Sequence, residues 1–168
     1  IRSGIKLADY HPANGVENGG PRRPVTIGMV ACLKPQKAPL DFVRVASRVV
    51  RLAPSGTALR FVLAGDGMLR REVEELIHQE GLDGFVELAG WRRDIPDLMR
   101  GFDILLHTSR WEGLPRVFPE AMASGLPIVA TLVDGAPEAI EDGVTGYLLQ
   151  PGDVEGLARR TLDLALDS

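Results

Sequence analysis

The chain has 168 residues, 45% of them hydrophobic and 25% charged, a composition typical of one globular domain with its own core. Its formal net charge of −4 argues against general nucleic-acid binding, which needs a basic face. No apolar stretch approaches the roughly 18 residues of a membrane span, and the single cysteine, Cys32, cannot form an internal disulfide, which favours a reducing cytosol.

The first 24 residues show no helical or strand periodicity. Asn–Gly and Gly–Gly pairs and two prolines, Pro21 and Pro24, interrupt them. We therefore expect residues 1–24 to form a lead-in segment from a missing N-terminal domain, ending in a mobile surface loop. The first residue is not methionine, which indicates a piece of a longer chain.

From residue 25 onward, short apolar runs alternate with segments whose apolar residues recur at helical spacing. The expected strands cover 25–30, 59–64, 85–88, 102–107, 127–130 and 146–149. The expected helices cover 40–53, 69–77, 95–100, 118–122, 137–141 and 154–166. Such alternation implies right-handed βαβ crossovers. Residues 25–168 are therefore predicted to form one α/β domain, a Rossmann-like doubly wound parallel sheet of about six strands with a truncated last crossover helix.

Residues 109–125 form a polar stretch between the strand that ends at 107 and the helix that follows. At the carboxyl ends of parallel strands, such loops and the helix N-termini face ligands. The free N–H groups and partial positive charge of a helix N-terminus suit a phosphate. Two carboxylates in this stretch, Glu112 and Glu120, suit hydroxyl groups instead. The pattern predicts a ligand that carries both phosphate and sugar.

These residues also have purely structural explanations. Lys34 and Lys37, in the loop after the first strand, either contact a diphosphate or are ordinary solvated lysines. Glu120, early in its helix, is favourable through the helix dipole alone, whereas Glu112 has no such explanation. His107, at a strand end, is expected to be a packing residue rather than a catalyst.

The sequence lacks the motifs that indicate other classes of ligand. The dinucleotide fingerprint G-x-G-x-x-G is missing, because no glycine follows Gly28 in the first loop and residues 65–67 lack the third glycine. A P-loop is absent. The histidines are scattered and no carboxylate cluster has the spacing of metal ligands, so we expect neither metal nor cofactor. Trp91, after the third strand, either flanks a base or covers core.

Taken together, the motifs resemble the C-terminal, donor-binding domain of a family 4 (group 1) glycosyltransferase with the two-domain GT-B fold. The matching stretches are residues 34–37, 61–67, 109–125 with the Glu-x7-Glu pair, 127–130, 135–138 and 142–146. Residues 3–5 and 10–12 resemble the exit from the family's first domain. The resemblance runs through most of the chain and lies in the order and spacing of the motifs.

The resemblance implies a retaining, metal-independent transfer of sugar from a nucleoside-diphosphate sugar, such as a UDP- or GDP-sugar. Glu112 and Lys37 would be the catalytic residues, with Glu112 hydrogen-bonded to hydroxyls of the transferred sugar and Lys37 paired with the diphosphate. The amides of Gly113 and Leu114 would lie beside the sugar. Lysine and helix-dipole charge would then stabilise the leaving group without a divalent cation.

The resemblance also implies the nucleotide contacts. The amides of Arg116 and Val117 would face phosphate, and Glu120 would accept from the ribose. Lys34 would add positive charge near the diphosphate, and the loop that contains Arg92 would border the base.

Three residues depart from the family pattern. The family usually has an arginine shortly before the lysine, whereas this chain has Cys32 in that stretch. Lys34 would supply the missing positive charge, but as a single ammonium group that cannot form the two parallel hydrogen bonds of an arginine. Pro115 lacks a backbone N–H where glycine is common. Ala38 follows Lys37 in place of the usual glycine.

The acceptor, a glycan, lipid or small molecule, would bind through the missing N-terminal domain, so this fragment is expected to be inactive alone. We expect a cytoplasmic protein, with any peripheral membrane association residing in the missing half. The alternatives are a GT-B epimerase or phosphorylase, or a non-catalytic carbohydrate- or protein-interaction module on the same fold. The interpretation fails if Lys37 lies far from Glu112, or if Glu112 is enclosed in an ion pair.

Overall fold

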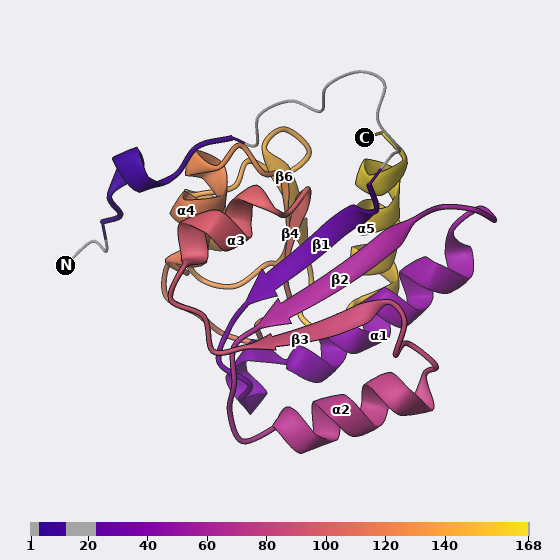
Figure 1. The fold of residues 1–168 in the computed structure, drawn as a ribbon. Coiled ribbons are helices and arrows are strands. Elements are labelled where there is room, and N and C mark those ends of the chain that lie inside the picture. The colour runs from indigo at the N-terminus through magenta and orange to yellow at the C-terminus, as the bar shows by residue number, and fades with distance from the viewer. Residues whose placement is uncertain (1–3, 13–22, 168) are drawn as a thin grey trace.

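The computed structural model of the protein describes residues 4–12 and 23–167. One all-parallel sheet has the spatial order β3-β2-β1-β4-β5-β6 (Figure 1). The strands are β1 (Val25–Val30), β2 (Leu59–Ala64), β3 (Val86–Gly90), β4 (Ile104–His107), β5 (Ile128–Thr131) and β6 (Gly146–Leu149). The helices are α1 (Pro39–Leu52), α2 (Arg70–Gln79), α3 (Ile95–Arg100), α4 (Val117–Ala123) and α5 (Val154–Leu166), with short 3-10 helices η1 (Leu7–Asp9), η2 (Pro35–Lys37) and η3 (Ala136–Glu138). The predicted α/β fold is confirmed.

Helices cover both faces of the sheet (Figure 1). On one face α1, α2 and α5 enclose a core that includes Phe42 and Phe61. On the other, α3 and α4 pack over a second core that includes Phe102 and Phe118. A sheet covered on both sides needs strands that are apolar on both sides, which explains why these strands are nearly continuous hydrophobic runs.

The strand order reverses at β1, which pairs with β2 on one side and with β4 on the other. After β1 the chain continues into α1 on one face, and after β4 into α4 on the opposite face. The two connecting loops therefore diverge at the carboxyl ends of neighbouring strands. This divergence is the position at which doubly wound sheets bind their ligands.

Most elements match the predicted ones to within a few residues, but the predicted helix at 137–141 is wrong. The chain forms only the three-residue η3 there. Pro137 can start a helix, but Asp142 already bridges to Gly146 at the start of β6, so too few residues remain for another turn. No helix among the described residues is long and apolar enough to cross a bilayer.

The predicted lead-in segment is described only in part. Residues 1–3 and 13–22 lie outside the described residues, so the mobile loop stays a prediction. Within residues 4–12, the side chain of Tyr10 is buried in the core beside α4. This part of the segment therefore packs against the domain.

Ala38 begins α1 in the left-handed conformation, with φ 45° and ψ 53°, and is the one non-glycine residue with positive φ in the described part of the chain. A Cβ in this region costs roughly 1–2 kcal/mol. We expect Ala38→Gly to raise the free energy of unfolding by about 0.5–1 kcal/mol, measured by urea denaturation. The matched variant Ala46→Gly, inside α1, should instead lower it by about 1 kcal/mol. A loss of stability in Ala38→Gly would contradict the strain.

Candidate functional site

The loops after β1 and β4 are fastened to each other at the carboxyl edge of the sheet. The backbone N–H of Arg110 donates to the carbonyl of Gln36 at 2.8 Å. The Gln36 side chain donates to the carbonyl of Trp111 at 2.9 Å, and the Thr108 hydroxyl donates to the carbonyl of Ala38 at 3.0 Å. These bonds fix the two loops relative to each other.

A buried carboxylate adds a further tie between α1 and the loop after β4. Asp41, in the first turn of α1, accepts from Arg110 at 2.9 Å and from Arg44 at 2.7 Å. A carboxylate at a helix N-terminus is also favourable through the helix dipole. Arg110 is therefore held by both its backbone and its side chain.

Between the fastened loops, Lys37 and Glu112 form an ion pair through Lys37 Nζ and Glu112 Oε1. Their side chains are 19% and 9% exposed. The Ser109 hydroxyl donates to the same Oε1 at 2.7 Å, and His107 Nε2 lies 3.3 Å from it. The predicted catalytic pair is thus in direct contact at one edge of the sheet.

The pKa of Glu112 reflects these contacts. Burial acts to raise it, but the hydrogen bonds from His107, Lys37 and Ser109 outweigh burial and hold the pKa at about 2. Burial lowers the pKa of His107 by more than Glu112 raises it, so the imidazole is neutral at pH 7. The cluster therefore combines a carboxylate, an ammonium group and a neutral imidazole.

The ion pair corrects one expectation. The sequence predicts Lys37 and Glu112 as separate ligand-binding groups, whereas the structure pairs them with each other. Opposite charges attract strongly where water is largely excluded. All three contacts fall on Oε1, and no described residue donates a hydrogen bond to Oε2. Two arrangements would contradict the sequence-based interpretation. Lys37 does not lie far from Glu112, so the first is excluded. The second, a Glu112 enclosed in an ion pair, applies to Oε1 but not to Oε2.

The residues after Glu112 rest against the loop that follows β5. The backbone N–H of Gly135 donates to the carbonyl of Gly113 at 3.1 Å. A Cβ on Gly135 would lie 2.3 Å from that carbonyl oxygen. Leu114 is exposed, and the N–H groups of Arg116 and Val117 lie at the start of α4, where a helix provides no intrahelical acceptor.

Glu120 lies in the first turn of α4, and its side chain is 10% exposed. Its Oε1 is 3.2 Å from Arg116 Nε, and the Tyr10 hydroxyl interacts with the carboxylate. Burial raises the pKa of Glu120 by more than Tyr10 and Arg116 lower it, and burial together with Glu120 raises the pKa of Tyr10 to about 12. The helix dipole is therefore not the only group acting on Glu120: its carboxylate also joins Tyr10 of the lead-in segment and Arg116 at the start of α4.

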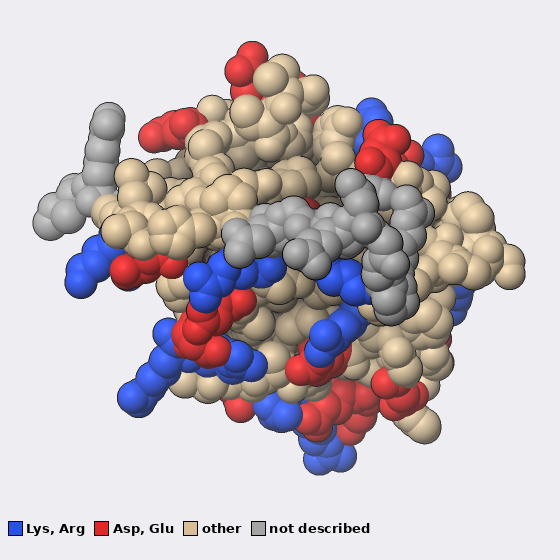
Figure 2. All heavy atoms as spheres, turned by 45° about the horizontal axis from the view of Figure 1, so that its top comes forward, with Lys and Arg blue, Asp and Glu red and all other residues tan. Residues whose placement is uncertain are grey.

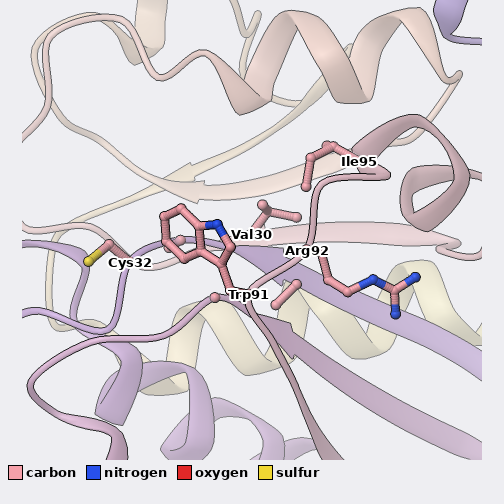
Figure 3. A pocket seen from close by; sticks show the side chains of 8 residues that line it. Val30, Cys32, Trp91, Arg92 and Ile95 are labelled. Atoms are coloured by element: carbon pink, nitrogen blue, oxygen red, sulfur yellow. The ribbon is translucent and has the colours of Figure 1, made fainter.

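A pocket of about 220 Å³ lies at the carboxyl ends of β1, β2 and β3. Figure 3 shows the indole ring of Trp91 over this pocket, with Cys32 at one end and Arg92 and Ile95 at the other. Trp91 is 69% exposed and so does not cover core. Arg92 Nε donates to Asp94 Oδ1 at 2.7 Å, and Arg92 Nη2 donates to Oδ2. The pocket is lined by one aromatic ring, by small and aliphatic residues and by Arg92.

The charged side chains show no large area of one sign on the face in Figure 2, where Lys and Arg lie next to Asp and Glu. Among the described residues, no three His, Cys, Asp or Glu side chains come together in a way that could hold a metal ion. The predicted lack of a metal requirement stays a prediction.

Most of the predicted site residues lie on the three loops that follow β1, β3 and β4: Lys34, Lys37, Arg92, Glu112, Gly113, Leu114 and Arg116, with Val117 and Glu120 in α4. Lys34 makes no ion pair with a described residue. Sequence reasoning missed Ser109 and Tyr10 as partners. His107 packs its ring edge-on against Phe118, with the centroids 5.2 Å apart, but it also faces Glu112. The two-residue spacing of His107 and Ser109 was a usable signal, because such residues of an extended chain point the same way.

A model of the family described as glycosyl transferases group 1 matches residues 24–167. The UDP-Gal:alpha-D-GlcNAc-diphosphoundecaprenol alpha-1,3-galactosyltransferase of Escherichia coli is 29% identical over 180 residues, which cover 99% of this chain and 46% of the relative.

Two solved structures are similar. A mutant of S. aureus TarM, in complex with Fondaparinux, alpha-GlcNAc-glycerol and UDP, superposes with a TM-score of 0.80 at 25% identity, over 91% of this chain and 31% of that one. Anabaena HepE in complex with UDP-glucose gives a TM-score of 0.74 at 31% identity, over 86% and 39%. The chain spans less than half the length of each of these proteins.

Proposed function

The chain belongs to the group 1 glycosyltransferases and has the fold of the C-terminal domain of the GT-B architecture, and we propose that it is the donor-binding domain of a retaining, metal-independent glycosyltransferase. It binds a nucleoside-diphosphate sugar, such as a UDP- or GDP-sugar. The acceptor, a glycan, lipid or small molecule, binds to a further domain of the longer protein. The contact between Lys37 and Glu112 at the strand-order reversal carries this proposal.

Each part of the site suits one part of such a donor. Glu112 accepts hydrogen bonds from hydroxyls of the transferred sugar, and its Oε2 receives none from the described residues. Lys37 exchanges the carboxylate for the diphosphate, which is also an anion. Glu120 accepts from the ribose. The pocket beside Trp91 takes the base, because its aromatic wall offers a stacking surface.

The proposed metal independence follows from charge. A departing diphosphate gains negative charge in the transition state, and a fixed positive group aimed at that charge lowers the barrier. Lys37 and the N–H groups of Arg116 and Val117 supply this charge. Two names support a nucleotide-sugar donor: the E. coli relative is named for UDP-Gal, and the HepE structure contains UDP-glucose.

Thermal denaturation with a panel of nucleotide sugars tests the proposal. A ligand that binds only the folded chain stabilises it by RT ln(1 + L/Kd), where L is the free ligand concentration, so the melting temperature rises with the logarithm of ligand concentration above Kd. We expect at least one UDP- or GDP-sugar to stabilise the chain, and NAD to have no effect. If neither nucleoside diphosphates nor their sugars stabilise it at millimolar concentration, the chain is not a donor-binding domain.

Gly135→Ala should weaken binding of the sugar part of the donor. Its Cβ would displace the Gly113 carbonyl, and with it the loop beside Glu112. We expect the preference for the best sugar nucleotide of the panel over its parent nucleoside diphosphate to fall roughly 5- to 10-fold, by isothermal titration. The control is Gly84→Ala, where a Cβ meets no atom within 4 Å. An unchanged preference in Gly135→Ala is the opposing result.

A further inference from the structure

His107 is the last residue of β4 and is 1% exposed. Its Nε2 lies 2.9 Å from the Ser109 hydroxyl and 3.3 Å from Glu112 Oε1. Its Nδ1 is the one buried side-chain nitrogen or oxygen in residues 4–12 and 23–167 that has no hydrogen-bond partner. Buried polar atoms are nearly always paired, so an unpaired one calls for a compensating role of the same side chain.

The partners of the imidazole decide where its proton lies. Nε2 faces an ionised carboxylate, and a bare nitrogen there would place a lone pair against a negative oxygen. The Ser109 hydroxyl has one proton, which it donates to Glu112 at 2.7 Å, so it can accept from Nε2. The proton is therefore assigned to Nε2, and Nδ1 keeps the unshared lone pair.

Two neutral donors thus hold Glu112 Oε1 in addition to Lys37. The uncharged ring of Phe118 also packs against the imidazole, and the Thr131 hydroxyl lies 3.5 Å from the backbone carbonyl of His107. A neutral donor has one advantage over a cation here: it does not compete for a phosphate. It stays with Glu112 when Lys37 moves to an anionic ligand.

We propose that His107 is a positioning residue that, with Ser109, keeps Glu112 in place when Lys37 exchanges it for the diphosphate of the donor. The inference rests on the function proposed above. It explains why a buried histidine with an unpaired nitrogen ends β4, where an aliphatic residue would pack without that cost.

Two isosteric variants separate positioning from packing. In His107→Gln the amide nitrogen lies near the place of Nε2, whereas in His107→Asn it lies near the place of Nδ1. The first measurement needs no ligand: titration of the Glu112 carboxyl by carbon-13 NMR. We expect the pKa of Glu112 to rise by roughly 1 pH unit in His107→Asn and in Ser109→Ala, and to stay near the wild-type value in His107→Gln. The control His78→Asn removes an exposed histidine on α2.

The second measurement compares the Kd of UDP with that of UDP-glucose, or of GDP with GDP-mannose if the chain prefers guanosine. His107→Asn should lower the preference for the sugar nucleotide about tenfold and change the nucleoside diphosphate Kd less than twofold. His107→Gln should restore the preference.

The outcomes distinguish the two proposals. If Glu112 titrates in His107→Asn and Ser109→Ala as in the wild type, His107 is not a positioning residue. If the wild-type chain binds no nucleotide, the proposed function fails, and the titration still decides whether His107 holds Glu112. Ser109 is fully buried but follows β4, and Ser109→Ala only removes the hydroxyl that contacts both His107 Nε2 and Glu112 Oε1. An unchanged titration of Glu112 in this variant therefore overturns the proposal even if the His107 variants do not fold.

Discussion

Replacing Lys37 with methionine is expected to weaken binding of a nucleoside diphosphate by about 10- to 100-fold. A hydrogen bond between charged groups contributes roughly 1.5–3 kcal/mol, and each 1.4 kcal/mol is a factor of ten in Kd. Methionine keeps the length and apolar stem of the side chain. His107 and Ser109 still hold Glu112 in this variant, so the loss reports on the ligand rather than on a collapsed site. Isothermal titration with UDP and GDP measures it.

Lys34→Met is the comparison for this variant. Lys34 lies in the same loop but makes no ion pair with a described residue, so nothing fixes its charge at the site. We expect a loss of only a few-fold. Equal losses of affinity in the two variants would mean that the nucleotide is attracted by positive charge in general. A Kd of Lys37→Met within twofold of the wild-type value would show that Lys37 does not contact the diphosphate.

Glu120→Gln is expected to stabilise the folded chain at pH 7 and at the same time to weaken nucleotide binding about tenfold. Burial raises the pKa of Glu120 above its value in the unfolded chain. Such a group favours folding fully below its unfolded pKa, near 4.5, and loses that contribution as pH rises through its folded pKa. At pH 7 the buried charge is therefore held at a cost, and glutamine removes it. We therefore expect a higher free energy of unfolding for Glu120→Gln than for the wild type at pH 7, and no gain below about pH 4.5, measured by urea denaturation at both pH values.

The same variant tests the ribose contact directly. Wild type should bind UDP more tightly than 2′,3′-dideoxy-UDP, and Glu120→Gln should bind the two about equally. Glu75→Gln, on the exposed face of α2, serves as the control for both stability and binding. We propose that the Glu120 carboxylate serves ligand binding at a cost to folding stability. A Glu120→Gln variant that is less stable than the wild type, or that still prefers UDP, would contradict this role.

The sheet could be predicted from sequence because its signal is local. Apolar runs of strand length, separated by helical periodicity, require parallel strands covered on both faces, and the motif of residues 109–125 follows one of those strands. The helix at 137–141 failed because its end is determined by the neighbouring bridge between Asp142 and Gly146, which no local pattern encodes.

For the site, the sequence predicts the location but not the contacts between side chains. Parallel topology places the loops after β1 and β4 at one edge, so Lys37 and Glu112 were expected near each other. Their pairing depends on side-chain geometry across the two loops, as does the contact of Tyr10 with Glu120, which joins residues 110 positions apart. The left-handed Ala38 was visible only as an alanine where the family pattern has glycine.

Lys37, Glu112 and Glu120 should line one nucleotide-binding site at the carboxyl edge of the sheet. The decisive measurement is a titration of the nitrogen-15-labelled chain with UDP and GDP in which the backbone amide shifts are mapped. We expect the largest changes in the loops after β1, β3 and β4 and in the first turn of α4. Changes confined to the opposite edge, around residues 54–58 and 143–146, or no change at millimolar nucleotide, would contradict it.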